Sequence, residues 1–185
     1  MRRHELEHAI RVSTEIVQQD TVIIIGSQSV LGTWNEEELP DEATLSGEVD
    51  IAPMHDDDAE SLATKLDGVV GELSAFHESH GYYVQGVGRK TAVLPDGWED
   101  RLVPVKTDWT NGGTGFCLDP VDLCIAKLVA HRDKDFSFVG ALLEAGLVDA
   151  AQLRERIDLL PASTDRRSID AVTGWVTSWQ HAHPR

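Results

Sequence analysis

A run of four β-branched residues at positions 22–25 constrains the fold of this 185-residue chain more than any other stretch. Apolar and polar side chains do not alternate in it, which predicts a central strand over residues 21–25 that is covered on both faces. Gly26 and Ser27 end the run, and residues 28–34 are expected to form one or two helical turns. The chain is therefore predicted to build a sheet around this strand, with a tight turn into a short helix at its end.

A second strand is predicted over residues 48–52, where acidic and apolar residues alternate. Successive side chains of a strand point to opposite faces, so Glu48 and Asp50 share one face while Val49 and Ile51 point into the core. Two carboxylates are thus brought together on one face of the sheet. The alternative interpretation is an exposed strand face on an acidic protein.

Further elements follow from hydrophobic spacing and turn residues. Helices are expected over residues 5–19 and 58–76, then from Asp119 onward, and over residues 136–145, 149–159 and 164–180. Short strands are expected over residues 82–87, 90–94 and 101–106, as a meander that extends the sheet, and over residues 116–118. The acidic segment 35–47 is expected to be a solvated loop.

This order of elements predicts an α+β fold. Residues 1–118 are expected to form a mixed sheet with flanking helices, and residues 119–185 a helical C-terminal part packed on that core. The length is sufficient for one domain with a small helical extension.

Composition restricts the partners. The chain has 16 Lys and Arg against 32 Asp and Glu, for a formal net charge of -16, which repels a polyanion such as DNA at long range. The mean hydropathy of -0.23 and the absence of a long apolar run predict a cytoplasmic protein without a membrane partner. In a reducing cytosol Cys117 and Cys124 are expected to remain thiols.

The two strand ends together predict a site for a triphosphate and a divalent cation. Magnesium takes oxygen ligands, and Glu48 and Asp50 can supply them from one strand face. A Gly-Ser turn presents backbone N–H groups and a hydroxyl group to phosphates, so Gly26 and Ser27 are candidate nucleotide-binding residues. Nucleotidyl transfer is a reaction that needs both groups of ligands.

The motifs around these residues carry a family resemblance. Residues 26–32 read Gly-Ser-Gln-Ser-Val-Leu-Gly, and residues 46–51 read Ser-Gly-Glu-Val-Asp-Ile. With these motifs the chain resembles nucleotidyltransferase-like proteins of the DNA polymerase β fold, especially a bacterial group related to toxin-antitoxin and phage-defence nucleotidyltransferases. Further similar segments are His77-Glu78, residues 81–88, Leu94-Pro95-Asp96-Gly97-Trp98 and residues 122–135.

The resemblance implies transfer of a nucleoside monophosphate from an NTP, with Mg²⁺ or Mn²⁺, to tRNA or to a cognate toxin or antitoxin protein. It also implies that a helical Lys contacts phosphate and that an Asp near it faces the acceptor or metal. These positions match Lys127 and Asp135, which join Glu48 and Asp50 as the expected catalytic residues. Lys134 is expected about two turns along nearly the same helix face and is a further nucleotide-binding candidate. The alternative is a surface helix end whose basic residues favour the helix dipole.

Two departures from the family pattern leave a second hypothesis open. Ser27 and Glu48 lie 21 positions apart, a long separation that contains the acidic segment. The strand at 101–106, expected to supply a third carboxylate, has no acid, although Asp100 and Asp108 flank its core. The chain is thus predicted either to be an enzyme, or to be a lapsed enzyme that binds nucleotide or a protein partner.

Overall fold

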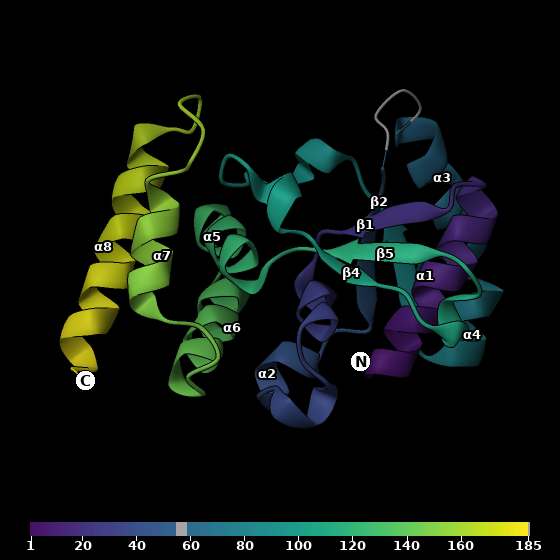
Figure 1. Ribbon diagram of the computed structural model, residues 1–185, viewed down its shortest axis with the longest axis horizontal. Coiled ribbons are helices and arrows are strands. Elements are labelled where there is room, and N and C mark those ends of the chain that lie inside the picture. The colour runs from purple at the N-terminus through teal and green to yellow at the C-terminus, as the bar shows by residue number, and fades with distance from the viewer. Residues whose placement is uncertain (55–58, 185) are drawn as a thin grey trace.

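The computed structural model describes residues 1–54 and 59–184. Within these residues, five strands form one mixed sheet in the order β3-β2-β1-β5-β4 (Figure 1). Strands β1 and β2 are antiparallel, β1 and β5 are parallel, β2 and β3 are parallel, and β4 and β5 are antiparallel. The strands are β1 (Thr21–Ile24), β2 (Glu48–Pro53), β3 (Tyr83–Gly86), β4 (Val103–Val105) and β5 (Thr114–Cys117).

Strand β1 is at the centre of the sheet because both of its faces are apolar. Val22, Ile23 and Ile24 have no exposed surface, as predicted for a strand that is covered on both sides. The β2 register brings Ile24 opposite Ile51, so the apolar residues of β2 join the same core. The acidic residues of β2 are left on the other face of that strand.

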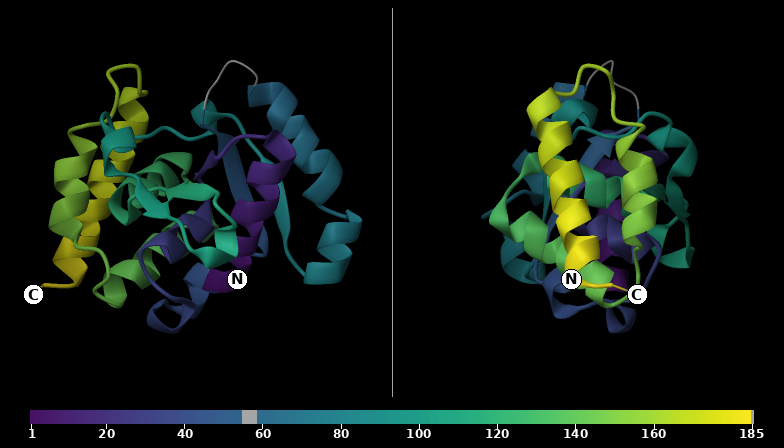
Figure 2. Two further views of the ribbon diagram at one scale, coloured as in Figure 1. Left: turned by 45° about the vertical axis from the view of Figure 1, so that its right-hand side comes forward. Right: turned by 90° about the vertical axis from the view of Figure 1, so that its left-hand side faces the viewer.

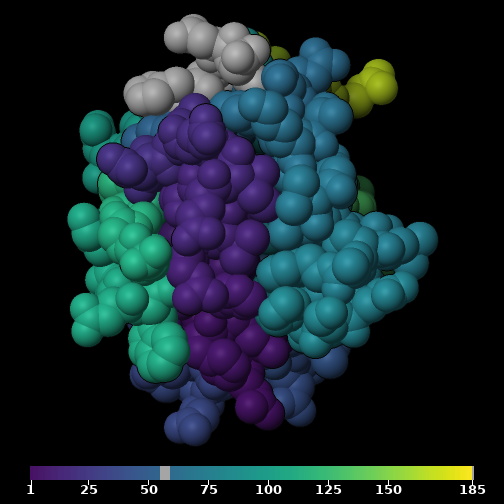
Figure 3. Space-filling model, turned by 90° about the vertical axis from the view of Figure 1, so that its right-hand side faces the viewer, coloured from purple at the N-terminus to yellow at the C-terminus, as the bar shows by residue number. Residues whose placement is uncertain are grey.

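One face of the sheet is covered by α1 (Arg3–Val17), α3 (Ala59–Val70) and α4 (Ala75–His80). Figure 3 shows α1 in the middle of this side of the molecule, with α3 and α4 beside it. Leu6 and Ile10 of α1 are fully buried, because helical spacing puts them on the apolar side of the helix.

Helical elements also occupy the other side of the sheet. The short 3-10 helix η1 (Ser27–Gly32) contacts β2, β4 and β5 and, on its outer side, α5 (Pro120–Ala130). Helix α5 packs against α6 (Asp133–Glu144), α7 (Ala150–Ile157) and α8 (Arg166–Ala182). The right-hand view of Figure 2 shows α7 and α8 as the outermost layer at this end.

The expected α+β fold, with a mixed sheet and flanking helices, is confirmed. The division at residues 118 and 119 stays a prediction. In the described part of the chain, no helix combines the length and the apolar character that crossing a bilayer requires.

The segment predicted as a strand over 90–94 is not one. Residues Arg89–Thr91 form a 3-10 turn, η4. Arg89 lies over the ring of Trp98, 5.4 Å from its centroid, and donates a hydrogen bond to the Met54 carbonyl oxygen. These contacts draw the segment away from the sheet edge. The expected meander is therefore wrong, since β3 and β4 lie at opposite edges of the sheet.

Two other boundaries also differ from the prediction. The helix expected over residues 58–76 is divided into α3 and α4 by a turn at residues 71–74, where Leu73 adopts a positive φ of 62°. Asp58, its expected first residue, lies outside the described residues. The segment 35–47 is not simply a loop, because it contains a 3-10 turn, η2 (Glu36–Glu38), and a helical turn, α2 (Asp41–Thr44).

Candidate active site

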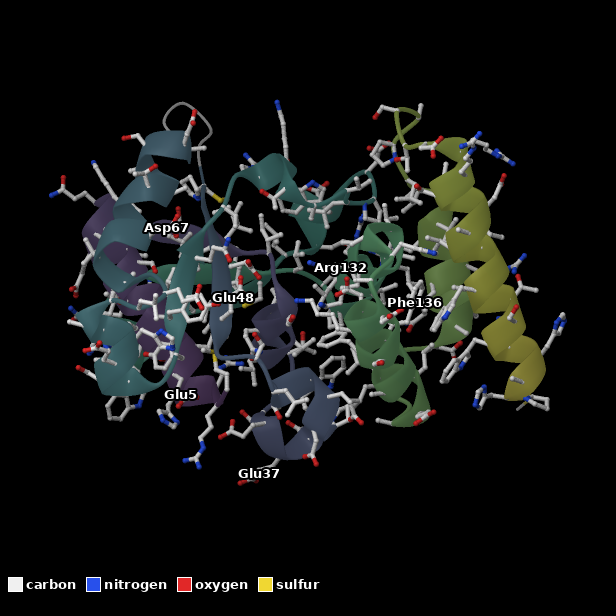
Figure 4. The ribbon with its side chains drawn as sticks, turned by 180° about the vertical axis from the view of Figure 1, so that it is seen from behind. Glu5, Glu37, Glu48, Asp67, Arg132 and Phe136 are labelled. Atoms are coloured by element: carbon white, nitrogen blue, oxygen red, sulfur yellow. The ribbon has the colours of Figure 1, made fainter. Side chains whose placement is uncertain are left out.

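A cleft of about 860 Å³ separates the end of the sheet from helices α5 and α6. In Figure 4, Glu48 lies on the sheet side of this cleft and Arg132 on the helical side. All seven predicted site residues line it: Gly26, Ser27, Glu48, Asp50, Lys127, Lys134 and Asp135. Residues from two distant parts of the chain, 26–50 and 127–135, are thus brought to one place.

The sheet side of the cleft is formed where β1 ends and β2 begins. Glu48 and Asp50, hereafter the acidic pair, share one face of β2, as the alternation predicts. Gly26 follows β1 and packs directly on Asp50: a Cβ atom at position 26 would lie 1.7 Å from Asp50 Oδ2. Only glycine therefore lets the turn backbone approach the carboxylate this closely.

The acidic pair is electrostatically unfavourable without a cation. Burial and the neighbouring Glu48 carboxylate raise the pKa of Asp50 to about 6, and a hydrogen bond with the Glu48 side chain adds to the shift. Lys127 and Arg132 oppose the shift but do not cancel it. A cation placed between the two carboxylates would relieve the repulsion.

Lys127 joins the two sides of the cleft. Its Nζ atom donates hydrogen bonds to Ser27 Oγ at 3.1 Å and to Asp135 Oδ1 at 3.0 Å. The same atom lies 4.4 Å from the centroid of the Phe138 ring. Lys127 comes from α5 and is buried, so the ammonium group is held in one position beside the Gly-Ser turn.

Asp135 is the fully buried partner of two basic side chains. Arg132 Nε lies 2.5 Å from Asp135 Oδ2, while Lys127 binds the other carboxylate oxygen. Burial acts to raise the pKa of Asp135, but hydrogen bonds from Arg132 and Lys127 outweigh it and hold the pKa below its ordinary value. Lys127, Arg132 and Asp135, hereafter the helical cluster, form a charge-paired unit.

The path of the chain after Lys127 differs from the prediction. Helix α5 ends at Ala130, and His131 adopts a left-handed conformation with φ 59°. Lys134 and Asp135 therefore lie in the first turn of α6 instead of continuing one helix face from Lys127. Both still face the cleft, because the α5–α6 turn folds α6 back beside α5.

The strand expected to supply a third carboxylate is in the wrong place to do so. Strand β4 lies at the edge of the sheet farthest from β3, with β1 and β5 between it and β2. Neither Asp100 nor Asp108 lines the cleft. The neighbour of β2 on the side away from β1 is β3, where Gln85 is the register partner of Asp50.

Sequence reasoning missed several residues of the site. Phe138, under the Lys127 ammonium group, and Arg132, three residues before Asp135, were not predicted to belong to it. The spacing of Arg132 and Asp135 in a helix is a signal that could have paired them. The neighbours of the acidic pair on β3 could not be predicted from the sequence, because the alternation of polar and apolar residues does not determine the order of strands.

The donor set fits a magnesium ion that is shared with a substrate. Within residues 1–54 and 59–184, no group of three or more His, Cys, Asp and Glu side chains is arranged to enclose a metal ion. Two carboxylates suffice for Mg²⁺ when phosphate oxygens and water complete its octahedral coordination. The acidic pair is such a two-ligand set, and Mn²⁺ would accept the same oxygens.

Comparison with known protein families identifies the family of this chain. Residues 4–184 match the family described as nucleotidyltransferase of unknown function (DUF6036). The chain belongs to this family. No curated protein and no solved structure matched the chain. The nucleotidyltransferase family therefore accounts for nearly the whole length, helices α5 to α8 included.

Proposed function

We propose that this nucleotidyltransferase-family protein is a magnesium-dependent enzyme that moves a nucleoside monophosphate from an NTP to a macromolecular acceptor. The observation that carries the proposal is the 3.1 Å hydrogen bond from Lys127 to Ser27. It places a buried ammonium group at the Gly-Ser turn, beside two carboxylates, within one cleft. Phosphate ligands and metal ligands are thereby adjacent.

Two groups of residues in the cleft have separate tasks in this proposal. The backbone of Gly26, the Ser27 hydroxyl group and the Lys127 and Lys134 ammonium groups bind the β and γ phosphates. Glu48 and Asp50 would hold Mg²⁺ or Mn²⁺, which supplies neutralisation of phosphate charge when bound. Because η1 is a six-residue 3-10 helix, its dipole adds little, and most of the positive charge comes from the lysines.

The transfer step uses an acceptor hydroxyl group. Its oxygen forms a bond to the α-phosphorus, while the bond from that phosphorus to the oxygen bridging the β-phosphate breaks. Pyrophosphate leaves with the bonding electrons. The hydroxyl proton passes to a carboxylate of the acidic pair and from there to solvent. Asp135 acts through Lys127 by holding it toward the phosphates.

Two acceptors are compatible with a toxin-antitoxin or phage-defence setting. The net charge of -16 favours a cognate toxin or antitoxin protein, because it repels nucleic acid at long range. Lys127, Arg132 and Lys134 at the cleft instead favour tRNA. Either acceptor brings a hydroxyl group to the same phosphorus.

The direct test is label transfer. The chain is incubated with Mg²⁺, each of the four α-³²P-labelled NTPs in turn, and either total tRNA or the protein encoded by the neighbouring gene. The expected result is label that stays on one acceptor in a denaturing gel and disappears with Asp50→Asn. The proposal fails if the unaltered chain labels neither acceptor, or if Asp50→Asn labels as well as the unaltered chain.

One observation favours a second candidate, a lapsed enzyme that binds nucleotide or a protein partner. The position beside Asp50 on β3 is Gln85, so no third carboxylate stands next to the acidic pair on that strand. In this case calorimetry would detect NTP binding while no label is transferred. Gln85→Glu would then be expected to restore transfer, since it adds a carboxylate to the strand beside Asp50.

A further inference from the structure

Strand β3 adds a second row of polar side chains beside the acidic pair. In the parallel β2–β3 register, Glu48 pairs with Tyr83 and Asp50 pairs with Gln85. Register partners in a sheet project to the same face, so Tyr83 and Gln85 face the same way as the acidic pair. Val84, between them, is fully buried on the opposite face.

Tyr83 lies beside the acidic pair in the sheet. Glu48 is its register partner on the neighbouring strand β2, so the two side chains lie side by side on one face of the sheet. The ring of His77, from α4, packs against the Tyr83 ring with a centroid separation of 4.8 Å, so the tyrosine is held from its other side. Tyr83 is therefore held next to Glu48, one of the two carboxylates.

Gln85 has the opposite character. Its side chain is exposed and, among the described residues, makes no hydrogen bond. An amide offers both a donor and an acceptor without charge. Next to the two carboxylates of the acidic pair, a neutral polar group avoids a third negative charge. Gln85 is thus free to bind an incoming polar group.

The strand order determines on which side of the acidic pair Tyr83 and Gln85 lie. Gly26 and Ser27 follow β1, on one side of β2, and Lys127 contacts Ser27 there. Strand β3 lies on the other side of β2. The phosphate-binding groups and the β3 row therefore flank the acidic pair from opposite sides.

Phosphoryl transfer requires the attacking and leaving oxygens to be roughly in line across the phosphorus. With pyrophosphate on the β1 side, the attacking hydroxyl group has to come from the β3 side. We propose that β3 forms the acceptor side of the site, where Gln85 contacts the acceptor and Tyr83 positions Glu48. The inference rests on the proposed function and deepens it.

The test separates acceptor use from NTP binding. Gln85→Ala and Tyr83→Phe are compared with the unaltered chain for acceptor KM, kcat and the Kd of NTP with Mg²⁺. The acceptor is total tRNA or the protein encoded by the neighbouring gene, whichever the chain labels. Gln85→Ala is expected to raise the acceptor KM, and Tyr83→Phe to lower kcat, each by about tenfold, the typical effect of one lost hydrogen bond. NTP Kd is expected to stay within about twofold, because neither residue lies on the phosphate side.

Tyr82→Phe is the matched control. Tyr82 precedes Tyr83 and is buried, and its hydroxyl group is 2.6 Å from His8 Nδ1. Tyr82→Phe therefore removes a tyrosine oxygen one position away from Tyr83. It is expected to leave kcat, the acceptor KM and the NTP Kd within about twofold, because adjacent strand residues face opposite ways. Circular dichroism melting curves check that all three variants fold.

The outcomes distinguish this inference from the proposed function. Transfer that both β3 variants leave unchanged overturns the inference alone. So does a loss of NTP affinity as large as the loss of acceptor use, because it would place β3 on the phosphate side. If the unaltered chain labels neither acceptor, the proposed function fails and the inference fails with it.

Discussion

The acidic pair and the helical cluster face each other across one cleft with opposite electrostatic states. Glu48 and Asp50 are two carboxylates on one face of β2, and the pKa of Asp50 is raised to about 6. In the helical cluster a single carboxylate, Asp135, is bound by Lys127 and Arg132, and its pKa is lowered. The first group needs a cation from outside the chain, whereas the second already contains its own.

Because of this difference, the acidic pair is expected to serve function and the helical cluster to serve stability as well. A charged group that lacks its counter-ion does not stabilise the fold and is available to bind a ligand. A buried group that is fully paired holds the fold, and breaking it leaves an uncompensated charge. Changes in the acidic pair should therefore reduce transfer and spare the fold, while changes in the helical cluster should affect both.

The largest effect is expected for Lys127→Met. This substitution leaves the fully buried Asp135 with only Arg132, whose side chain is 59% exposed. Breaking one side of a buried pair costs about 3–5 kcal/mol of unfolding free energy. Urea titration measures the loss, and NTP affinity should fall with it because Ser27 loses its ammonium partner.

The double variant Lys127→Met with Asp135→Asn is the control for this prediction. It removes the orphaned charge, so it should recover part of the stability without recovering NTP binding. A single variant as stable as the unaltered chain would show that the helical cluster does not hold the fold.

Asp50→Asn should give the next largest effect, on transfer alone. The change removes a metal ligand and the like-charge repulsion together, so transfer should fall by about 10²–10³-fold while the unfolding free energy stays equal or rises. Label transfer and urea titration provide the two measurements. Asp108→Asn, on an exposed residue outside the cleft, is the matched control. Equal losses of transfer in the two variants would contradict a special role for the acidic pair.

The two regions also differ in how far the sequence could predict them. The acidic pair follows from side-chain alternation over a few consecutive residues, and Gly26 with Ser27 follows from the end of an apolar run. The contact between Lys127 and Ser27 joins positions 100 residues apart, which no local pattern describes. Family resemblance, and not periodicity, put Lys127 and Asp135 in the site.

The predictions that are wrong also concern contacts between distant parts of the chain or the conformation of a single residue. Extended segments bounded by turn residues predict β3 and β4, but the places of these strands at opposite edges of the sheet depend on pairing with β2 and β5. A third carboxylate on β4 would be separated from β2 by β5 and β1. The turn at His131 was missed because the helical pattern continues across it, and only the left-handed backbone at that residue redirects the chain.

Magnesium and pH are expected to have a smaller effect, on the free energy of unfolding. Because the pKa of Asp50 in the folded chain, about 6, exceeds its unfolded value, the destabilisation caused by the ionised acidic pair is present above pH 6 and disappears as the pH falls below it. Magnesium binds the ionised carboxylates. At a concentration of about ten times its Kd, magnesium should raise the unfolding free energy by about 1.4 kcal/mol at pH 8. This gain should be lost as the pH falls through about 6, because Asp50 is then protonated.

Thermal melting with and without Mg²⁺ at pH 5 and pH 8 measures this effect. Asp50→Asn should abolish the gain at both values. An equal gain at pH 5 and pH 8 would mean that the ion binds elsewhere.

Arg132→Ala should have the smallest effect and defines the limit of the helical cluster. Arg132 is largely exposed, and Lys127 remains on Asp135 when it is removed, so the loss of stability should be about 1 kcal/mol or less. If Arg132 only supports Asp135, transfer should fall by no more than about fivefold, the factor that corresponds to about 1 kcal/mol. A fall of about 100-fold at unchanged stability would instead make Arg132 a ligand of the transferred phosphate, because losing a charge contact made in the transition state lowers rate without unfolding the chain. The cluster would then contain one residue that belongs functionally with the acidic pair.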